Sequence, residues 1–237
     1  MDLPASITQL HGGLVVSCQA LEDEPLHGAP IMAAMARAAV AGGAVGIRAN
    51  SPVDIAAIKA AVDVPLIGLY KEAISGYEVY ITPTVEHARA VAAAGADIIA
   101  VDATLRPHPH GLDAAELIRR IKAETGKPVL ADIATLEEGL SAWQAGADAL
   151  STTLSGYTAD SPRQEAPDFT LLRRLAAQAA IPVFAEGRIA TPEQALRALE
   201  LGAYAVIVGS AITRPQWITR QFTSRMARGT AASGDAQ

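Results

Sequence analysis

The chain has 237 residues, of which 50% are hydrophobic and only 4% aromatic, and its formal net charge is -6 at pH 7. Because acidic and basic residues are interspersed, this charge argues against a nucleic-acid or anionic-membrane surface. A single cysteine, Cys18, excludes an intramolecular disulfide and any zinc site built from several cysteines. The N-terminus is too polar for a signal peptide and no apolar run is long enough to cross a membrane, so we expect a soluble cytoplasmic protein.

Eight short apolar segments recur along the chain and are predicted to be β-strands. Each is entered through a glycine, which ends a helix in a left-handed conformation, or through a proline, which prevents a helix from continuing. In chain order they lie within GGLVVSCQA from Gly12, AGGAVGIRAN from Ala41, VDVPLIGLYK from Val62, AGADIIAVDAT from Ala94, TGKPVLADIAT from Thr125, AGADALSTTLS from Ala145, AAIPVFAEGR from Ala179 and LGAYAVIVGS from Leu201. Short apolar runs that lead straight into polar residues are typical of buried parallel strands.

The segments between these strands are rich in alanine and have helical spacing. Several begin with capping residues: Ser51 and Thr191 each precede a proline, and Thr135 with Glu138 fits a capping box. The predicted helices span residues 30–41, 52–61, 84–94, 113–125, 136–145, 168–179, 192–201 and 215–226. Strands that alternate with such helices predict right-handed βαβ units and a parallel sheet.

Eight units of this kind predict an α/β fold whose sheet closes on itself, the (β/α)8 or TIM barrel. An open doubly wound sheet is the alternative, but no G-x-G-x-x-G sequence follows the first strand. We expect a single domain over residues 1–228 and a disordered tail over residues 229–237. Three long loops, at residues 22–30, 72–83 and 157–167, follow strands, which places them on the active-site face of such a barrel.

Every predicted strand ends in a side chain that can form hydrogen bonds or ionise, and in a closed barrel these ends converge on one mouth. They are Gln19, Arg48, Lys71, Asp102, Asp132, Thr152 or Thr153, Glu186 and Ser210. For any one of them, a surface residue at the start of a loop is the alternative. The convergence of all eight predicts a polar pocket.

Lys71 and Glu186 are the candidate catalytic residues. Lys71 leaves an apolar strand, and both burial and a neighbouring cation such as Arg48 would lower its pKa towards the range of a general base. A salt-bridged lysine and a Schiff-base lysine are the alternatives. Glu186 lies four strands further round the barrel and therefore across the mouth, unless it forms a structural ion pair with Arg188.

Glycines and cations around the last two predicted strands indicate a phosphate site. Gly187 and Gly209 would let backbone N–H groups approach an anion, a short helix after Ser210 would offer its N-terminus, and Arg188 or Arg214 would add charged hydrogen bonds. His108 and His110, in RPHPHG, have the spacing of an exposed turn. With no third ligand evident nearby, no metal site is predicted.

These motifs resemble the N-acetylmannosamine-6-phosphate 2-epimerases of bacterial amino-sugar and sialic acid catabolism, from Gly12 to about Phe222. The matching stretches are SCQA, LHG, GIRAN, EVYITPT, DATLRP, ADIATLEEG, TTLSGYT, FAEGRI, TPEQA and VIVGSAITRPQ. The resemblance implies inversion at C2 of N-acetylmannosamine 6-phosphate to give N-acetylglucosamine 6-phosphate, by way of the ring-opened aldehyde. It implies no cofactor, a small amino-sugar phosphate as the partner, and a homodimer.

The resemblance also implies individual roles. Lys71 would remove the C2 proton, and Glu186 would assist ring opening and proton return. Gln19, Arg48 and Asp132 would hold the sugar, while Gly187, Arg188, Gly209, Ser210 and Arg214 would bind the phosphate. Many members have a basic residue and an aspartate after the lysine, but here Glu72-Ala73-Ile74 follows, and Glu72 would either raise the pKa of Lys71 or contact a different loop. Another sugar-phosphate isomerase, a Schiff-base aldolase and a non-catalytic sugar-phosphate-binding barrel stay open as alternatives.

Overall fold

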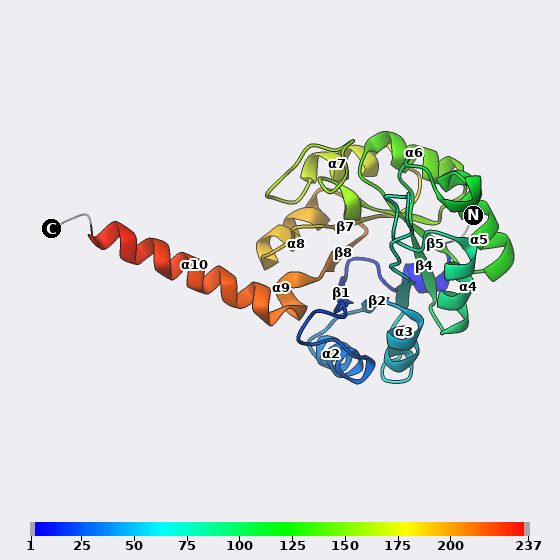
Figure 1. Ribbon diagram of the computed structural model, residues 1–237. Coiled ribbons are helices and arrows are strands. Elements are labelled where there is room, and N and C mark those ends of the chain that lie inside the picture. The colour runs from blue at the N-terminus through cyan, green and yellow to red at the C-terminus, as the bar shows by residue number, and fades with distance from the viewer. Residues whose placement is uncertain (1–2, 235–237) are drawn as a thin grey trace.

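The computed structural model describes residues 3–234, with side chains described up to residue 227. Its eight parallel strands close into a barrel in which each strand pairs with the next and the last pairs with the first. The strands are β1 (Leu14–Cys18), β2 (Gly46–Asn50), β3 (Leu66–Leu69), β4 (Ile98–Asp102), β5 (Val129–Asp132), β6 (Ala149–Ser151), β7 (Val183–Glu186) and β8 (Ala205–Val208). The predicted TIM barrel is confirmed (Figure 1).

Helices surround this barrel at the predicted places. They are α2 (Ala29–Ala41), α3 (Pro52–Lys59), α4 (Val85–Ala93), α5 (Ala114–Thr125), α6 (Leu136–Gln144), α7 (Phe169–Gln178) and α8 (Pro192–Glu200). The capping box is present, because the Thr135 side chain accepts from the Glu138 N–H while the Glu138 side chain accepts from the Thr135 N–H. The predicted short helix after β8 is α9 (Ser210–Thr213). The sequence did not predict α1 (Ala5–Thr8) or the 3-10 turns η1 (Pro109–Gly111) and η2 (Thr152–Leu154).

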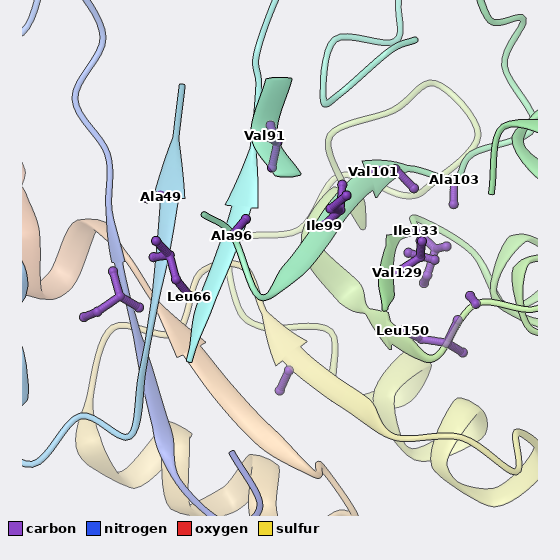
Figure 2. Close-up of a cluster of buried hydrophobic side chains, with 14 of the residues drawn as sticks. Ala49, Leu66, Val91, Ala96, Ile99, Val101, Ala103, Val129, Ile133 and Leu150 are labelled. Carbon is purple, nitrogen blue, oxygen red and sulfur yellow. The ribbon is translucent and has the colours of Figure 1, made fainter. Parts of the chain in front are cut away.

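The strands alternate between two apolar layers, as strands of a closed barrel must. Outward-facing side chains pack under the helices, and Figure 2 shows part of this layer, including Ala49, Ile99 and Val101. Inward-facing side chains such as Leu130 and Phe184 fill the barrel. Successive inward-facing positions lie two residues apart, and at the C-terminal end of a strand the last of them is polar. Asp132 follows Leu130 in this way, and Glu186 follows Phe184.

The N-terminal end of the barrel is closed by the chain that precedes β1. Ile7 of α1 and Leu10 are fully buried within the interior cluster. A Cβ on Gly46 would lie 2.4 Å from Leu10 Cδ2, so a larger residue at the start of β2 would force the buried Leu10 side chain to move. The pocket must therefore open at the other end, where the strands finish in polar residues.

The last helix, α10 (Pro215–Gly234), leaves the barrel and extends away from it (Figure 1). It is longer than the predicted helix, since it continues past Met226 into the segment for which we expected a disordered tail. The alanines of that segment favour helix, which accounts for the difference. Residues 235–237 of the expected tail lie outside the described residues, and the domain boundary at residue 228 stays a prediction. Among the described residues, no helix is both long and apolar enough to span a membrane.

Candidate active site

A pocket of about 650 Å³ opens at the C-terminal ends of the strands. It brings together eight of the ten predicted site residues: Gln19, Lys71, Glu186, Gly187, Arg188, Gly209, Ser210 and Arg214. The other two, Arg48 and Asp132, do not line it, because their side chains are 1% and 0% exposed. The expectation that these two would hold the sugar directly therefore does not fit the structure. Arg48 occupies the middle of β2, in register with Ile67 of the apolar interior, and so lies one layer deeper.

Lys71 lies two residues after the end of β3 and is held by two neighbouring segments. Its backbone N–H donates to Asn50 Oδ1 at 2.8 Å, and it forms an isolated antiparallel bridge with Ile81 from the far side of its own loop. Burial, aided by the positive charge of Arg48, lowers the pKa of the Lys71 ammonium to about 8. A fraction of the amine is then neutral near physiological pH, as a general base requires.

Below the pocket, the buried Arg48 guanidinium joins Asp132 to Glu186, which lines the pocket. Its Nη2 donates to Asp132 Oδ2 at 2.6 Å, and its Nη1 donates to Asp132 Oδ1 at 2.9 Å and to Glu186 Oε2 at 2.7 Å. The guanidinium thus meets Asp132 through two parallel hydrogen bonds and Glu186 through one. The alternative sequence-based partner for Glu186 was Arg188, and the structure pairs Glu186 with Arg48 instead.

Two hydroxyl groups from the end of β6 complete the surroundings of Glu186. Thr153 Oγ1 lies 2.8 Å from Glu186 Oε2, and Ser151 Oγ lies 3.2 Å from the same oxygen. Burial raises the pKa of the Glu186 carboxyl, and the charge of Asp132 adds to the rise, although Arg48 opposes it. Glu186 is therefore placed to hold a proton at pH values where an exposed glutamate would be ionised.

Gln19 carries an unsatisfied hydrogen-bonding group at the pocket wall. Its Nε2 donates to Ser17 Oγ at 2.7 Å, whereas its buried Oε1 has no partner among the described residues. A buried acceptor without a donor is costly, so this oxygen is suited to receive a hydrogen bond from a bound molecule.

At the predicted phosphate end of the pocket, two consecutive residues have positive φ angles, and the guanidinium of the second is held by two contacts. Gly187 and Arg188 both have positive φ, +102° and +57°, which turns the chain sharply after β7. The Arg188 guanidinium lies 4.0 Å from the ring centroid of Tyr157 and donates to the Ser155 carbonyl at 2.7 Å. Gly209 and Ser210 meet at the start of α9. The arrangement presents a cation and glycine backbone to one side of the pocket.

Arg214 lines the pocket but is already bound to another residue. Its Nη2 donates to Glu24 Oε1 at 2.5 Å, and Gln216 Nε2 donates to Glu24 Oε2 at 3.0 Å. Glu24 belongs to the loop after β1, so this contact ties that loop to the start of α10. Arg214 retains further N–H groups that could face an anion.

Several pocket residues were missed at the sequence level. Tyr80, Tyr157 and Trp217 all line the pocket. The first two stand in EVYITPT and TTLSGYT, two of the stretches that carry the resemblance, and this could have identified them. Trp217 follows a helical pattern and gives no comparable signal.

His108 differs from expectation, and His87 has a partner in the loop after β3. His108, expected in an exposed turn, is 1% exposed, and its ring nitrogens lie 3.0 Å from the carbonyl oxygens of Arg106 and Asp102. His87, on α4, contacts Glu72 Oε2 through Nε2 at 2.8 Å. Glu72 therefore contacts helix α4, whereas the outcome considered was a contact with a different loop. No group of three or more potential metal-ligating His, Cys, Asp or Glu side chains occurs in the described part of the chain.

Comparison with known proteins identifies the relatives of this chain. Residues 32–228 match the family model described as "Putative N-acetylmannosamine-6-phosphate epimerase". A protein of Caldanaerobacter subterraneus with the name "Putative N-acetylmannosamine-6-phosphate 2-epimerase" is 57% identical over 219 residues, which cover 92% of both chains. A protein of the same name from Cutibacterium acnes is 50% identical over 218 residues, covering 91% of this chain and 94% of the relative.

A solved structure agrees with these matches. The N-acetylmannosamine-6-phosphate 2-epimerase of Clostridium perfringens is 46% identical and has a TM-score of 0.91, covering 94% of this chain and 97% of that one. Identity and coverage at these levels extend over the barrel and the loops that form the pocket. The chain belongs to the N-acetylmannosamine-6-phosphate epimerase family.

Proposed function

We propose that this protein interconverts N-acetylmannosamine 6-phosphate and N-acetylglucosamine 6-phosphate by inverting C2. Family membership and the names of the relatives support the substrate. The single observation that carries the chemistry is the presence of Lys71 and Glu186 in one pocket, four strands apart in an eight-stranded barrel and hence on opposite sides. Two proton-transferring groups facing one substrate suit an inversion of configuration.

The reaction begins with ring opening, because the hydrogen on C2 is acidic only next to a carbonyl group. Protonated Glu186 gives its proton to the ring oxygen, the bond from C1 to that oxygen breaks, and the C1 hydroxyl becomes an aldehyde as its own proton passes to the Glu186 carboxylate. Lys71, as the neutral amine, then takes the C2 proton and leaves an enolate. Glu186 assists the return of a proton to the opposite face of C2.

The other predicted residues bind and position the substrate. The free Oε1 of Gln19 accepts a hydrogen bond from a sugar hydroxyl or from the acetamido N–H. Arg188, with the backbone of Gly187, Gly209 and Ser210, binds the phosphate, and Arg214 adds a second cation. Arg48 and Asp132 lie beneath the pocket and act through Glu186, since Arg48 bonds to both carboxylates.

Proton NMR in deuterated water tests this proposal. We expect wild-type enzyme to convert N-acetylmannosamine 6-phosphate into N-acetylglucosamine 6-phosphate that carries deuterium at C2, because the proton removed by Lys71 exchanges with solvent. Formation of the epimer with its original hydrogen would contradict separate groups for removal and return. No conversion of this sugar phosphate would overturn the substrate assignment.

We also propose that the protein is a homodimer and that α10 forms the contact with a second copy. A barrel strand is normally covered from outside by the helix that follows it. After β8 this helix, α9, has only four residues, and α10 turns away (Figure 1). An apolar groove of about 460 Å³ lies beside the α9 residue Ile212 and is lined by Leu14, Leu196 and Leu199. A second copy carries an apolar segment for this groove on its own α10, where Phe222 is 68% exposed.

Light scattering after size-exclusion chromatography checks the dimer. Wild-type protein should elute with the mass of two chains, and Phe222→Asp should elute as one chain, because a buried carboxylate at the contact is unfavourable. Arg220→Ala, also on the exposed part of α10, is the control and should leave the dimer intact. A wild-type monomer, or a Phe222→Asp dimer of unchanged stability, would contradict this arrangement.

A further inference from the structure

Thr153, in the turn η2 directly after β6, contacts the carboxyl groups of both Asp132 and Glu186 with one hydroxyl group. Its Oγ1 lies 2.6 Å from Asp132 Oδ1 and 2.8 Å from Glu186 Oε2. Ser151 Oγ lies 2.8 Å from the same Oγ1. The carboxylates come from β5 and β7, the two strands that flank β6. Thr153 is therefore the hydroxyl that bridges Asp132, which lies below the pocket, and Glu186, which lines it.

The number of protons in this contact limits how it can be arranged. A hydroxyl group donates one hydrogen bond and accepts up to two, whereas an ionised carboxylate only accepts. If both carboxylates were ionised, Thr153 could donate to only one of them, and its oxygen would face the other at hydrogen-bond distance without a proton between them. A proton on one of the carboxyl groups would make both short contacts hydrogen bonds, and Arg48 Nη1, at 3.5 Å from Thr153 Oγ1, is the one further N–H group that the structure places near this oxygen among the described residues.

The contacts of Arg48 indicate which carboxyl group holds that proton. Asp132 receives two N–H groups from Arg48, at 2.6 and 2.9 Å, a pairing that suits an ionised carboxylate. Glu186 receives only one, at 2.7 Å. The charged groups that face Glu186 are Arg48 from β2, Asp132 from β5 and Lys71 after β3. Burial raises the pKa of the Glu186 carboxyl, which agrees with the geometric assignment.

We propose that Thr153 is a positioning residue that turns its hydroxyl between Asp132 and Glu186 as Glu186 loses and regains its proton. In the acid state, the Glu186 O–H donates to Thr153 Oγ1 while the Thr153 O–H donates to Asp132. To reach the substrate oxygen, the Glu186 O–H must leave Thr153, which it does by rotation of the carboxyl group about the Cγ–Cδ bond. After the proton has been given up, the Thr153 O–H rotates to donate to the Glu186 carboxylate oxygen that now faces it, and Asp132 keeps its two bonds from Arg48. Thr153 never loses its proton, so the switch needs only rotation of the Glu186 carboxyl group and of the Thr153 hydroxyl. This role rests on the proposed function of Glu186 in ring opening.

The two states lose different numbers of hydrogen bonds when the hydroxyl is removed. In Thr153→Val, the acid state loses both the bond from Glu186 and the bond to Asp132, whereas the ionised state loses only the bond to Glu186. The acid state is therefore destabilised more, and Glu186 should give up its proton at lower pH. Thr153→Ser retains the hydroxyl and should behave as wild type.

Infrared difference spectroscopy of the free protein measures this directly. The C=O stretch of the protonated Glu186 carboxyl, identified by its loss in Glu186→Gln, is followed during a pH titration. We expect its midpoint to fall by about half to one pH unit in Thr153→Val and to return to the wild-type value in Thr153→Ser. With substrate, kcat should fall in Thr153→Val at nearly unchanged KM and recover in Thr153→Ser.

A neighbouring threonine provides a matched control. Thr152 Oγ1 contacts only the backbone of Glu186, accepting from its N–H at 3.0 Å and donating to its carbonyl at 2.8 Å. Thr152→Val should lower stability without moving the midpoint of the Glu186 band. An unmoved midpoint in Thr153→Val, or a shift that Thr153→Ser does not reverse, overturns the proposal. Because the titration needs no substrate, it decides the role of Thr153 even if the epimerase assignment fails.

Discussion

Replacing Lys71 with methionine is expected to lower kcat for epimerisation by about 10²–10⁴-fold, the usual contribution of a general base, and to stop deuterium uptake at C2. Methionine has nearly the length of lysine and tolerates the partly buried environment, while the backbone bond from Lys71 to Asn50 does not depend on the side chain. The variant should therefore fold normally and still bind the sugar phosphate. Proton NMR for exchange and isothermal titration for binding provide the two measurements.

The pH dependence of the wild-type enzyme supplies a second readout for the same residue. The base must be the neutral amine, so kcat/KM should rise with pH through the value of about 8 to which burial lowers the pKa of Lys71. At lower pH the ammonium has no lone pair with which to accept the C2 proton. If kcat/KM were already independent of pH well below this value, the pKa of another group would limit the reaction.

Lys59 offers a control that shows whether replacing any lysine with methionine lowers activity. It pairs with Asp97 at 2.6 Å on the outside of the barrel, and Lys59→Met should retain full activity. C2 exchange that survives in Lys71→Met would overturn the assignment of the base. Covalent trapping of substrate on Lys71 by borohydride would instead indicate a Schiff base.

The barrel could be predicted because its signals are local in the sequence. Glycine or proline before each strand marks where a helix ends, and an apolar run that finishes in a polar residue marks the strand and its open end. Lys71 and Glu186 stand at strand ends, so their place in the pocket follows directly from the parallel arrangement. The closure of eight such units fixes on which side of the pocket each one lies.

The pairings below and beside the pocket could not be predicted in the same way. Arg48 stands two residues before the end of β2, and only the stagger of the closed barrel shows that it lies one layer deeper and joins Asp132 to Glu186. The contact of Arg214 with Glu24 joins residues 190 positions apart, and no local pattern encodes it. Side-chain partners of this kind depend on distances across the barrel rather than on spacing along the chain.

Replacing Arg48 with methionine is expected to reduce the free energy of unfolding by about 3–5 kcal/mol, the usual cost of breaking a buried ion pair. Arg48 is 1% exposed and is the cation that contacts both Asp132 and Glu186. Methionine fills much of the same volume, so the main loss is electrostatic: Asp132, 0% exposed, keeps a charge without its two guanidinium hydrogen bonds. Urea unfolding followed by circular dichroism measures the change.

The exposed pair of Arg197 and Glu200 is a suitable control for this prediction. Its N–O distance of 2.9 Å resembles those of Arg48, but both side chains are more than half exposed, at 55% and 51%. Arg197→Met should therefore change the free energy of unfolding by less than about 1 kcal/mol. Equal effects of the two substitutions would contradict a special role for burial.

A double variant shows whether Arg48→Met is destabilised by the unpaired charge of Asp132 or by the loss of packing around the arginine. If the instability of Arg48→Met arises from an uncompensated carboxylate, then Arg48→Met combined with Asp132→Asn should be more stable than Arg48→Met alone, because the amide carries no charge to desolvate. If packing of the arginine stem were the main contribution instead, the second substitution would add its own cost and lower stability further. If the double variant is more stable than Arg48→Met, the ion pair makes the main contribution to stability beneath the pocket. If it is less stable, packing of the arginine stem makes that contribution.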